Sequence, residues 1–240
     1  MLAPILTPEA SGFVEWSLFP SDWSISNYIE LFLYQPGFFV LFWNSIKICA
    51  GVLIGQLFIA VPAAWAFSRY SFKGKNALFL IYVIFMLLPF QVLMLSEYLI
   101  FNELGLLNTL WSIILPGIFS TFPVFIMRNF FMGIPTETLE AARIDGASEF
   151  QIFLYIGVPV ALPGISAVMI LQFLEYWNLV EQPMIFLENP AKWPLSLYLP
   201  TINLENAGIA LCAAFITLIP SYLIFRLIPI CSLSPQNLCC

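Results

Sequence analysis

The sequence predicts an all-α, polytopic transmembrane helical bundle, and its composition and its long apolar segments are the observations that predict it. Hydrophobic side chains make up 61% of the 240 residues and charged side chains 9%. In soluble globular domains, apolar side chains average about 45–50% and charged side chains about 25%. Water could not hydrate the surface of such a chain, so lipid is the expected solvent for most of its length. We expect five membrane spans and no large soluble domain.

Each span is predicted from an apolar run near the length of about 20 residues that crosses a bilayer. The five runs are 38–67, 77–100, 110–131, 158–179 and 207–227. Prolines interrupt several of them, which membranes tolerate because neighbouring helices satisfy the freed backbone groups. Asn108 is well placed to cap the third helix. Residues 38–227 therefore form the predicted transmembrane domain.

The two ends of the chain differ from this domain. Residues 1–37 hold four acids and no Lys or Arg. They lack the positive start and the apolar core of a signal peptide, so we expect an external segment. Residues 228–240 form a short tail rich in Cys, Ser and Pro.

Orientation follows from the cations, because loops rich in Lys and Arg stay in the cytoplasm. With the amino end outside, the cytoplasmic cations are Arg69, Lys73, Lys75, Arg128, Arg143 and Arg226. Lys192 is then external, and Lys47 lies in the first span, where it can snorkel to the interface. This threading makes segment 133–157 cytoplasmic and segments 101–108 and 181–206 external.

Segment 133–157 has the signals of two short helices joined by a glycine turn. Pro135 and Glu137 suit a first helical turn, and Gly146 suits a left-handed stop. Ser148 and Gln151 have the spacing of a capping box, which starts a second helix. Small residues on the first helix and its turn would let another protein approach closely. From spacing alone, a docking surface and a plain connector between spans are both open.

The pattern becomes specific when its parts are read together. Glu140-Ala141-Ala142, Gly146, Ile156 and Val158-Pro159 resemble the EAA loop of ABC-importer permeases, with Val158 where the family has Leu. Residues 141–148 resemble the version in carbohydrate-uptake permeases of the maltose-transporter type. Further similar segments are 104–108, 114–117, 130–135 and 177–178, and the resemblance covers about residues 28–225.

The resemblance implies an ABC importer type I permease fold in a bacterial inner membrane. It also implies three protein partners: a second permease subunit, a pair of cytoplasmic ATPase subunits and an external solute-binding protein that delivers a sugar. In such importers the EAA helix moves with the ATPase and switches the pathway between inward and outward access. The ATPase-coupling residues expected here are Glu140, Ala141, Ala142, Arg143, Asp145, Gly146, Ile156 and Pro159. We expect Glu140 to make a polar contact with the ATPase and the small residues to pack closely against it.

The chain itself is expected not to be an enzyme. It has no histidine, the commonest general base and metal ligand. It also has no Gly-rich phosphate loop ending in Gly-Lys-Ser/Thr, so the nucleotide binds to the partner. No catalytic residue, metal, cofactor or nucleic-acid partner is predicted.

A weaker prediction concerns the solute pathway. Glu175, Trp177 and Asn178 lie near the outer end of the fourth span. An aromatic ring with amide and carboxylate groups suits a sugar, and an interfacial aromatic belt explains the same residues equally well.

Two departures from the family pattern stand at the ends. Its members usually have a further span before the external segment and a different stretch after the last span. We therefore expect a late start and an altered reading frame at the end. The alternatives are a non-transporting scaffold or truncated permease, a permease for a non-sugar solute, and an ATP-independent channel or carrier.

Overall fold

Every regular element in the described part of the chain is a helix. The computed structural model describes residues 29–34, 36–198 and 207–233. The elements are η2 (Glu30–Tyr34), α2 (Pro36–Arg69), α3 (Lys75–Leu87), α4 (Phe90–Glu103), α5 (Trp111–Ile118), α6 (Thr121–Met132), α7 (Thr136–Ile144), α8 (Glu149–Ile152), η3 (Phe153–Gly157), α9 (Val158–Trp177), α10 (Glu181–Phe186), η4 (Pro190–Lys192), α11 (Leu195–Tyr198) and α12 (Ala207–Leu233). The all-α prediction is confirmed.

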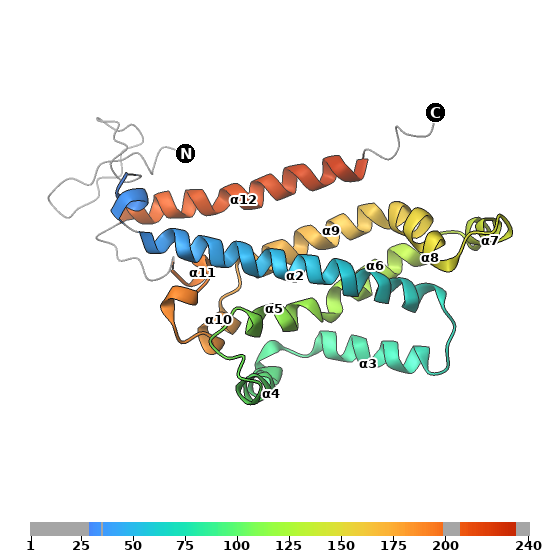
Figure 1. Cartoon of the computed structure of the whole chain (residues 1–240), viewed down its shortest axis with the longest axis horizontal. Coiled ribbons are helices and arrows are strands. Elements are labelled where there is room, and N and C mark those ends of the chain that lie inside the picture. Colours follow the sequence, from blue (N-terminus) through green and yellow to red (C-terminus); the bar gives the residue numbers. More distant parts are fainter. Residues whose placement is uncertain (1–28, 35, 199–206, 234–240) are drawn as a thin grey trace.

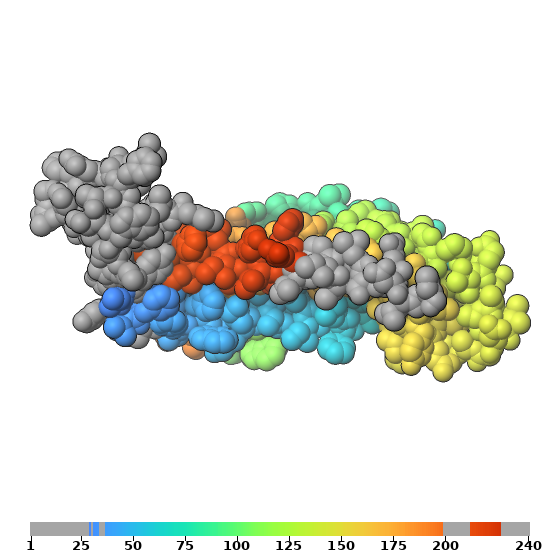
Figure 2. All heavy atoms as spheres, turned by 90° about the horizontal axis from the view of Figure 1, so that it is seen from above, coloured from blue at the N-terminus to red at the C-terminus, as the bar shows by residue number. Residues whose placement is uncertain are grey.

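The long helices run side by side along the longest axis of the molecule (Figure 1). α2 packs against α5, α6 and α9, and α12 packs along α9. α7 and α8 lie at one end of the bundle, whereas α4, α10 and α11 lie at the other. In the space-filling view α12 lies beside α2, and the α7–α8 region forms the far end of the molecule (Figure 2). The predicted cytoplasmic segment and residues 181–198 of the predicted external segment thus fall at opposite ends.

Three helices are long and apolar enough to cross a membrane: Gly37–Arg69, Trp111–Met132 and Glu149–Trp177. The pair Lys75–Leu87 and Phe90–Glu103 forms a fourth candidate, bent by 100°. α12 continues for 27 residues to Leu233, past the predicted end at residue 227, and is about 40 Å long. The count of five spans stays a prediction. Most of the predicted external segment 1–37 lies outside the described residues.

The predicted second span, 77–100, is broken in the structure between α3 and α4. Leu88 is extended (φ −72°, ψ 128°) and Pro89 is the N-cap of α4. Proline has no backbone N–H, and it pushes the preceding residue out of the helical region. On the far side of this break, Phe90, Tyr98 and Phe101 of α4 surround Phe186 of α10 with ring centroids 5.8–6.4 Å apart. This packing gives α4 its new direction.

Asn108 does not cap the third span, because Leu110 is the N-cap of α5. Asn108 instead adopts a left-handed conformation, with φ at 55°. Its Oδ1 accepts from the backbone N–H of Asn189 at 3.1 Å, and its carbonyl accepts from Lys192 Nζ at 2.6 Å. Asn44 of α2 donates to the carbonyl of Ala191 at 2.9 Å. These bonds hold the loops at the α10 end of the bundle against each other and against α2.

Candidate functional site

Residues 133–157, which we call the coupling loop, fold as the predicted helix, glycine turn and helix. The first helix, α7, buries one apolar side chain, Leu139, while Glu140 and Ala141 are exposed and Ala142 is half-buried. Leu139 belongs to a core cluster with Ile134, Ile152 and residues of α2 and α6. One face of the loop is therefore fixed to the bundle and the other is open.

Gly146 ends α7 in the left-handed conformation that the sequence predicted, with φ at +85°. The N–H of Gly146 bonds to the carbonyl of Arg143 at 3.1 Å, and the N–H of Ala147 bonds to the carbonyl of Ala142 at 3.0 Å. These two bonds form a Schellman motif, which satisfies the last carbonyls of a helix. A short, defined turn results.

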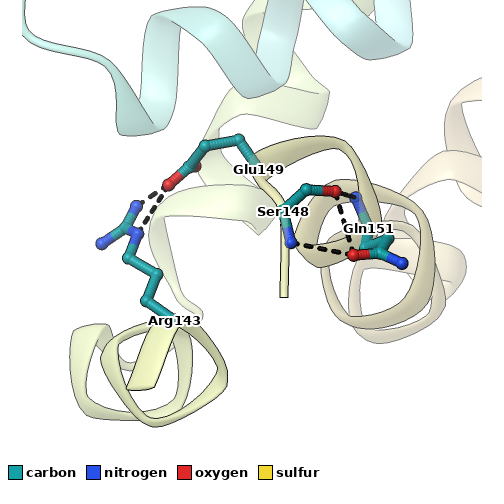
Figure 3. Close-up of polar contacts among 4 residues, drawn as sticks. All are labelled: Arg143, Ser148, Glu149 and Gln151. Atoms are coloured by element: carbon teal, nitrogen blue, oxygen red, sulfur yellow. Dashed lines mark hydrogen bonds and ion pairs between the residues drawn. The ribbon is translucent and has the colours of Figure 1, made fainter. Parts of the chain in front are cut away.

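The second helix starts with the predicted capping box (Figure 3). The N–H of Gln151 donates to Ser148 Oγ at 3.4 Å, and the N–H of Ser148 donates to Gln151 Oε1 at 2.8 Å. Arg143 Nε also donates to Glu149 Oε1 at 2.6 Å, which joins α7 to α8 across the turn. This hydrogen bond from Arg143 lowers the pKa of the Glu149 carboxyl below its ordinary value.

The structure brings some of the predicted coupling residues together and leaves others apart. Asp145, Gly146 and Ile156 line an open hollow of about 340 Å³ between the turn and the second helix. Arg143 and Glu140 are exposed on α7, and Pro159 is exposed in the first turn of α9, outside this hollow. The eight residues therefore do not form a single cluster: four lie on α7, three line the hollow, and Pro159 lies on α9.

Sequence reasoning missed three apolar side chains at this end of the molecule. Ile144, Phe150 and Tyr155 are 86%, 69% and 72% exposed. Tyr155 lines the hollow described above, whereas Ile144 and Phe150 lie outside it. The signal was present in the sequence, since Ile144 lies between two charged residues directly before the glycine turn.

Sequence reasoning also missed a π-helical turn. η3 spans Phe153–Gly157 and connects α8 to α9 without a break in the helix. Such turns often occur at functional sites.

The predicted pathway residues do not share one surface. Trp177 is 5% exposed, stacks on Phe173 at 5.4 Å and donates to the carbonyl of Thr217 on α12 at 3.2 Å. Glu175 and Asn178 are exposed. Asn178 donates to the carbonyl of Leu174 at 2.8 Å.

Glu175 is the open end of a polar chain that the sequence did not reveal. Gln172 Nε2 donates to Glu175 at 2.7 Å, and Gln56 Nε2 donates to Gln172 Oε1 at 2.7 Å and to the carbonyl of Gly117 at 2.8 Å. Both glutamines are 0% exposed. The hints were Gln56 and Gln172, polar residues within the first and the fourth apolar runs. Within the described residues, no group of three His, Cys, Asp or Glu side chains could hold a metal ion.

Comparison with known proteins identifies the family. The profile of the family described as "Binding-protein-dependent transport system inner membrane component" matches residues 56–231. The chain belongs to this family. As an inner-membrane transport component, it is a multi-pass membrane protein and not an enzyme.

Curated relatives match over most of their length. An arabinooligosaccharides transport system permease protein of Halalkalibacterium halodurans is 32% identical over 209 residues, which are 86% of this chain and 75% of the relative. A probable ABC transporter permease protein of Pyrococcus horikoshii is 34% identical over 221 residues, 88% of this chain and 79% of the relative.

A solved structure shows the same fold. It is the crystal structure of a bacterial ABC transporter involved in the import of the acidic polysaccharide alginate. The TM-score is 0.82 at 24% identity, over 95% of this chain and 86% of that chain. The predicted ABC importer permease fold is confirmed.

Proposed function

We propose that this chain is a permease subunit of a binding-protein-dependent ABC importer for a sugar or an oligosaccharide. The observation that carries the proposal is the coupling loop, which has a fixed inner face and an exposed outer face at one end of the bundle. The arabinooligosaccharide relative and the alginate importer support a saccharide as the solute.

The partners follow from this function. An external solute-binding protein delivers the saccharide, as the family description indicates. A second permease subunit completes the pathway, and a cytoplasmic ATPase pair receives the coupling loops. α7 enters the ATPase surface through Glu140, Ala141 and Gly146, and the exposed side chains of Ile144 and Tyr155 supply apolar contact area. ATP is hydrolysed in the ATPase, and only the movement of the coupling loop is transmitted to the bundle.

We infer that the coupling loop lies in the cytoplasm. The cations at the α7 end include Arg69, Lys73 and Arg143, whereas Lys192 is near the α10 end and bonds to Asn108. Cytoplasmic loops carry the excess of Lys and Arg. Residues 1–37 are then external.

In the pathway, Glu175 and Asn178 contact the solute, and Trp177 supports them from the core. A carboxylate and an amide can hydrogen-bond to sugar hydroxyls. Gln172 and Gln56 fix the orientation of Glu175 from behind through the bonds described above.

Co-purification of the ATPase tests the coupling assignment. The chain carrying Gly146→Trp is co-expressed with the partner permease and ATPase subunits of its own organism. Gly74→Trp is a matched control, because Gly74 also has a left-handed backbone (φ +84°) with no atom within 4 Å of an added Cβ, and it lies outside the coupling loop. Gly146→Trp is expected to lose the ATPase while Gly74→Trp retains it. Retention of the ATPase at the wild-type level by Gly146→Trp would refute the docking assignment.

A further inference from the structure

At the coupling-loop end of the bundle, α2 and α6 each donate an arginine to the other helix. Arg69 is the last residue of α2, and Arg128 lies in α6. The last four carbonyls of a helix have no partner within the helix, and the negative end of the helix dipole favours a cation there. Each arginine meets such a carbonyl on the neighbouring helix.

Arg69 bonds to both sides of the corner at which the chain leaves the bundle. Its Nη2 donates to the carbonyl of Phe131, in the last turn of α6, and to the carbonyl of Ile134. Ile134 lies outside α6 and immediately precedes Pro135, the N-cap of α7. The second bond therefore does not stabilise α6. It sets where the coupling loop begins.

Trp65, one helical turn before Arg69, contacts the other end of the loop. The guanidinium of Arg69 lies over its ring at 5.8 Å from the centroid. The same ring meets Phe131 at 5.3 Å and Phe153, at the start of η3, at 5.6 Å. It also covers Gly157, where an added Cβ would lie 2.7 Å from the ring. One turn of α2 thus touches both the entry and the exit of the coupling loop.

Arg128 makes the reciprocal contact. Its Nε donates to the carbonyl of Phe67, in the last turn of α2, at 3.2 Å. Its guanidinium lies over the ring of Phe79 of α3, 4.1 Å from the centroid. Arg128 therefore connects α2, α3 and α6 next to the coupling loop.

We propose that Arg69 is a positioning residue that transmits displacement of the coupling loop into α2. The inference rests on the proposed function, because it assumes that the loop is moved by an ATPase. The two N–H groups of Nη2 bind one carbonyl on either side of the corner, and the planar guanidinium fixes the direction of both bonds. The compact ammonium of lysine keeps the charge but has no planar group with fixed donor directions, so charge and geometry can be separated by substitution.

The test uses the full importer complex in lipid vesicles and a reporter at the opposite end of the bundle. Met184 of α10 is 71% exposed, and Met184→Cys carries an environment-sensitive dye. Cys231, Cys239 and Cys240 are changed to serine, whereas Cys49 and Cys212 are buried and stay. The readouts are ATPase bound per complex, ATP hydrolysis rate and the fluorescence change on ATP addition.

Arg69→Gln is expected to bind the ATPase and to hydrolyse ATP like the wild type, with a fluorescence change at least about fivefold smaller. The fluorescence change of Arg69→Lys is expected to lie between that of the wild type and that of Arg69→Gln. Lys73→Gln is the matched control, because Lys73 is an exposed cation of the same segment and should leave the change intact.

Three outcomes are distinguishable. A wild-type fluorescence change in Arg69→Gln overturns the inference. Loss of assembled complex in both Arg69→Gln and Arg69→Lys also overturns it, because Arg69 would then be a folding residue. If the parent protein itself gives no change on ATP addition, the proposed function fails first.

Discussion

Arg143 and Glu149 form an ion pair across the glycine turn of the coupling loop, with Arg143 Nε 2.6 Å from Glu149 Oε1 (Figure 3). Both side chains are 45% exposed. Their pairing closes the angle between α7 and α8, which the Schellman motif and the capping box set from the backbone. The loop is therefore held as one unit by three independent local devices.

The ion pair does not titrate near neutral pH, so the loop geometry should not change with pH in that range. The pKa of the Glu149 carboxyl is lowered by the hydrogen bond from Arg143. The pair is present above the ordinary glutamate pKa of about 4.3 and is lost only as the pH falls through the lowered value. ATPase binding by the wild type and by Glu149→Gln should therefore run in parallel between about pH 6 and 8. Curves that diverge within this range would show a different role for Glu149.

A methyl group at Gly157 should destabilise the protein more than one at Gly164. The added Cβ of Gly157→Ala would lie 2.7 Å from the ring of Trp65, which is buried against Phe131 and Phe153. Overpacking of this kind costs about 1–3 kcal/mol. At Gly164 the added Cβ would lie closer to its obstacle, 2.2 Å from Cγ of Phe130, but this side chain is 45% exposed, so rotation about its Cα–Cβ bond can move the ring away.

Thermal unfolding in detergent, followed by size-exclusion chromatography, measures both variants. Equal or reversed losses of stability for Gly157→Ala and Gly164→Ala would contradict the packing described around Trp65.

The two buried glutamines should behave as a coupled pair. Gln56→Leu leaves the carbonyl of Gly117 and Oε1 of Gln172 without their donor, and an unpaired buried group costs more than the loss of one bond. Gln172→Leu leaves Gln56 bonded to Gly117. The coupling energy from a double-mutant cycle on thermal stability should be about 0.5–1.5 kcal/mol. Strict additivity would argue against the direct bond.

Substitutions of Trp177 and Asn178 should affect stability and transport differently. Trp177→Ala removes a ring packed against Phe173 and a bond to Thr217, so stability should fall by about 3–5 kcal/mol. Asn178→Ala is exposed and should change stability by less than about 0.5 kcal/mol. Uptake of the importer's labelled saccharide by vesicles that contain the importer should fall in Asn178→Ala all the same. Full uptake in Asn178→Ala and in Glu175→Gln would remove both residues from the pathway.

Local signals in the sequence predicted the coupling loop well. Gly146, Ser148 and Gln151 act on backbone groups within five residues of themselves, so their spacing alone determines the turn and the cap. The helical membrane fold was also predictable from local sequence, because each span is a continuous run of apolar residues and needs no knowledge of which residues it contacts.

Contacts between distant residues could not be predicted in this way. Gln56 and Gln172 are 116 positions apart, and neither is marked by its neighbours as the partner of the other. Prolines were recognised as interruptions of the apolar runs, but the 100° bend at Pro89 could not be predicted, because α4 packs against Phe186 of α10, which is distant in the sequence. Asn108 resembles a helix cap in sequence, but its bonds go to Asn189 and Lys192 in a loop that joins it only after folding.

Sidedness is the most direct test of the account, because the coupling loop can meet an ATPase only in the cytoplasm. Glu140→Cys and Met184→Cys are exposed positions at opposite ends of the bundle. Each is probed with a membrane-impermeant maleimide in right-side-out and in inverted vesicles, with Cys231, Cys239 and Cys240 changed to serine. The account predicts that Glu140→Cys reacts only in inverted vesicles and Met184→Cys only in right-side-out ones. Labelling of Glu140→Cys from the outside, or from neither side, would contradict it.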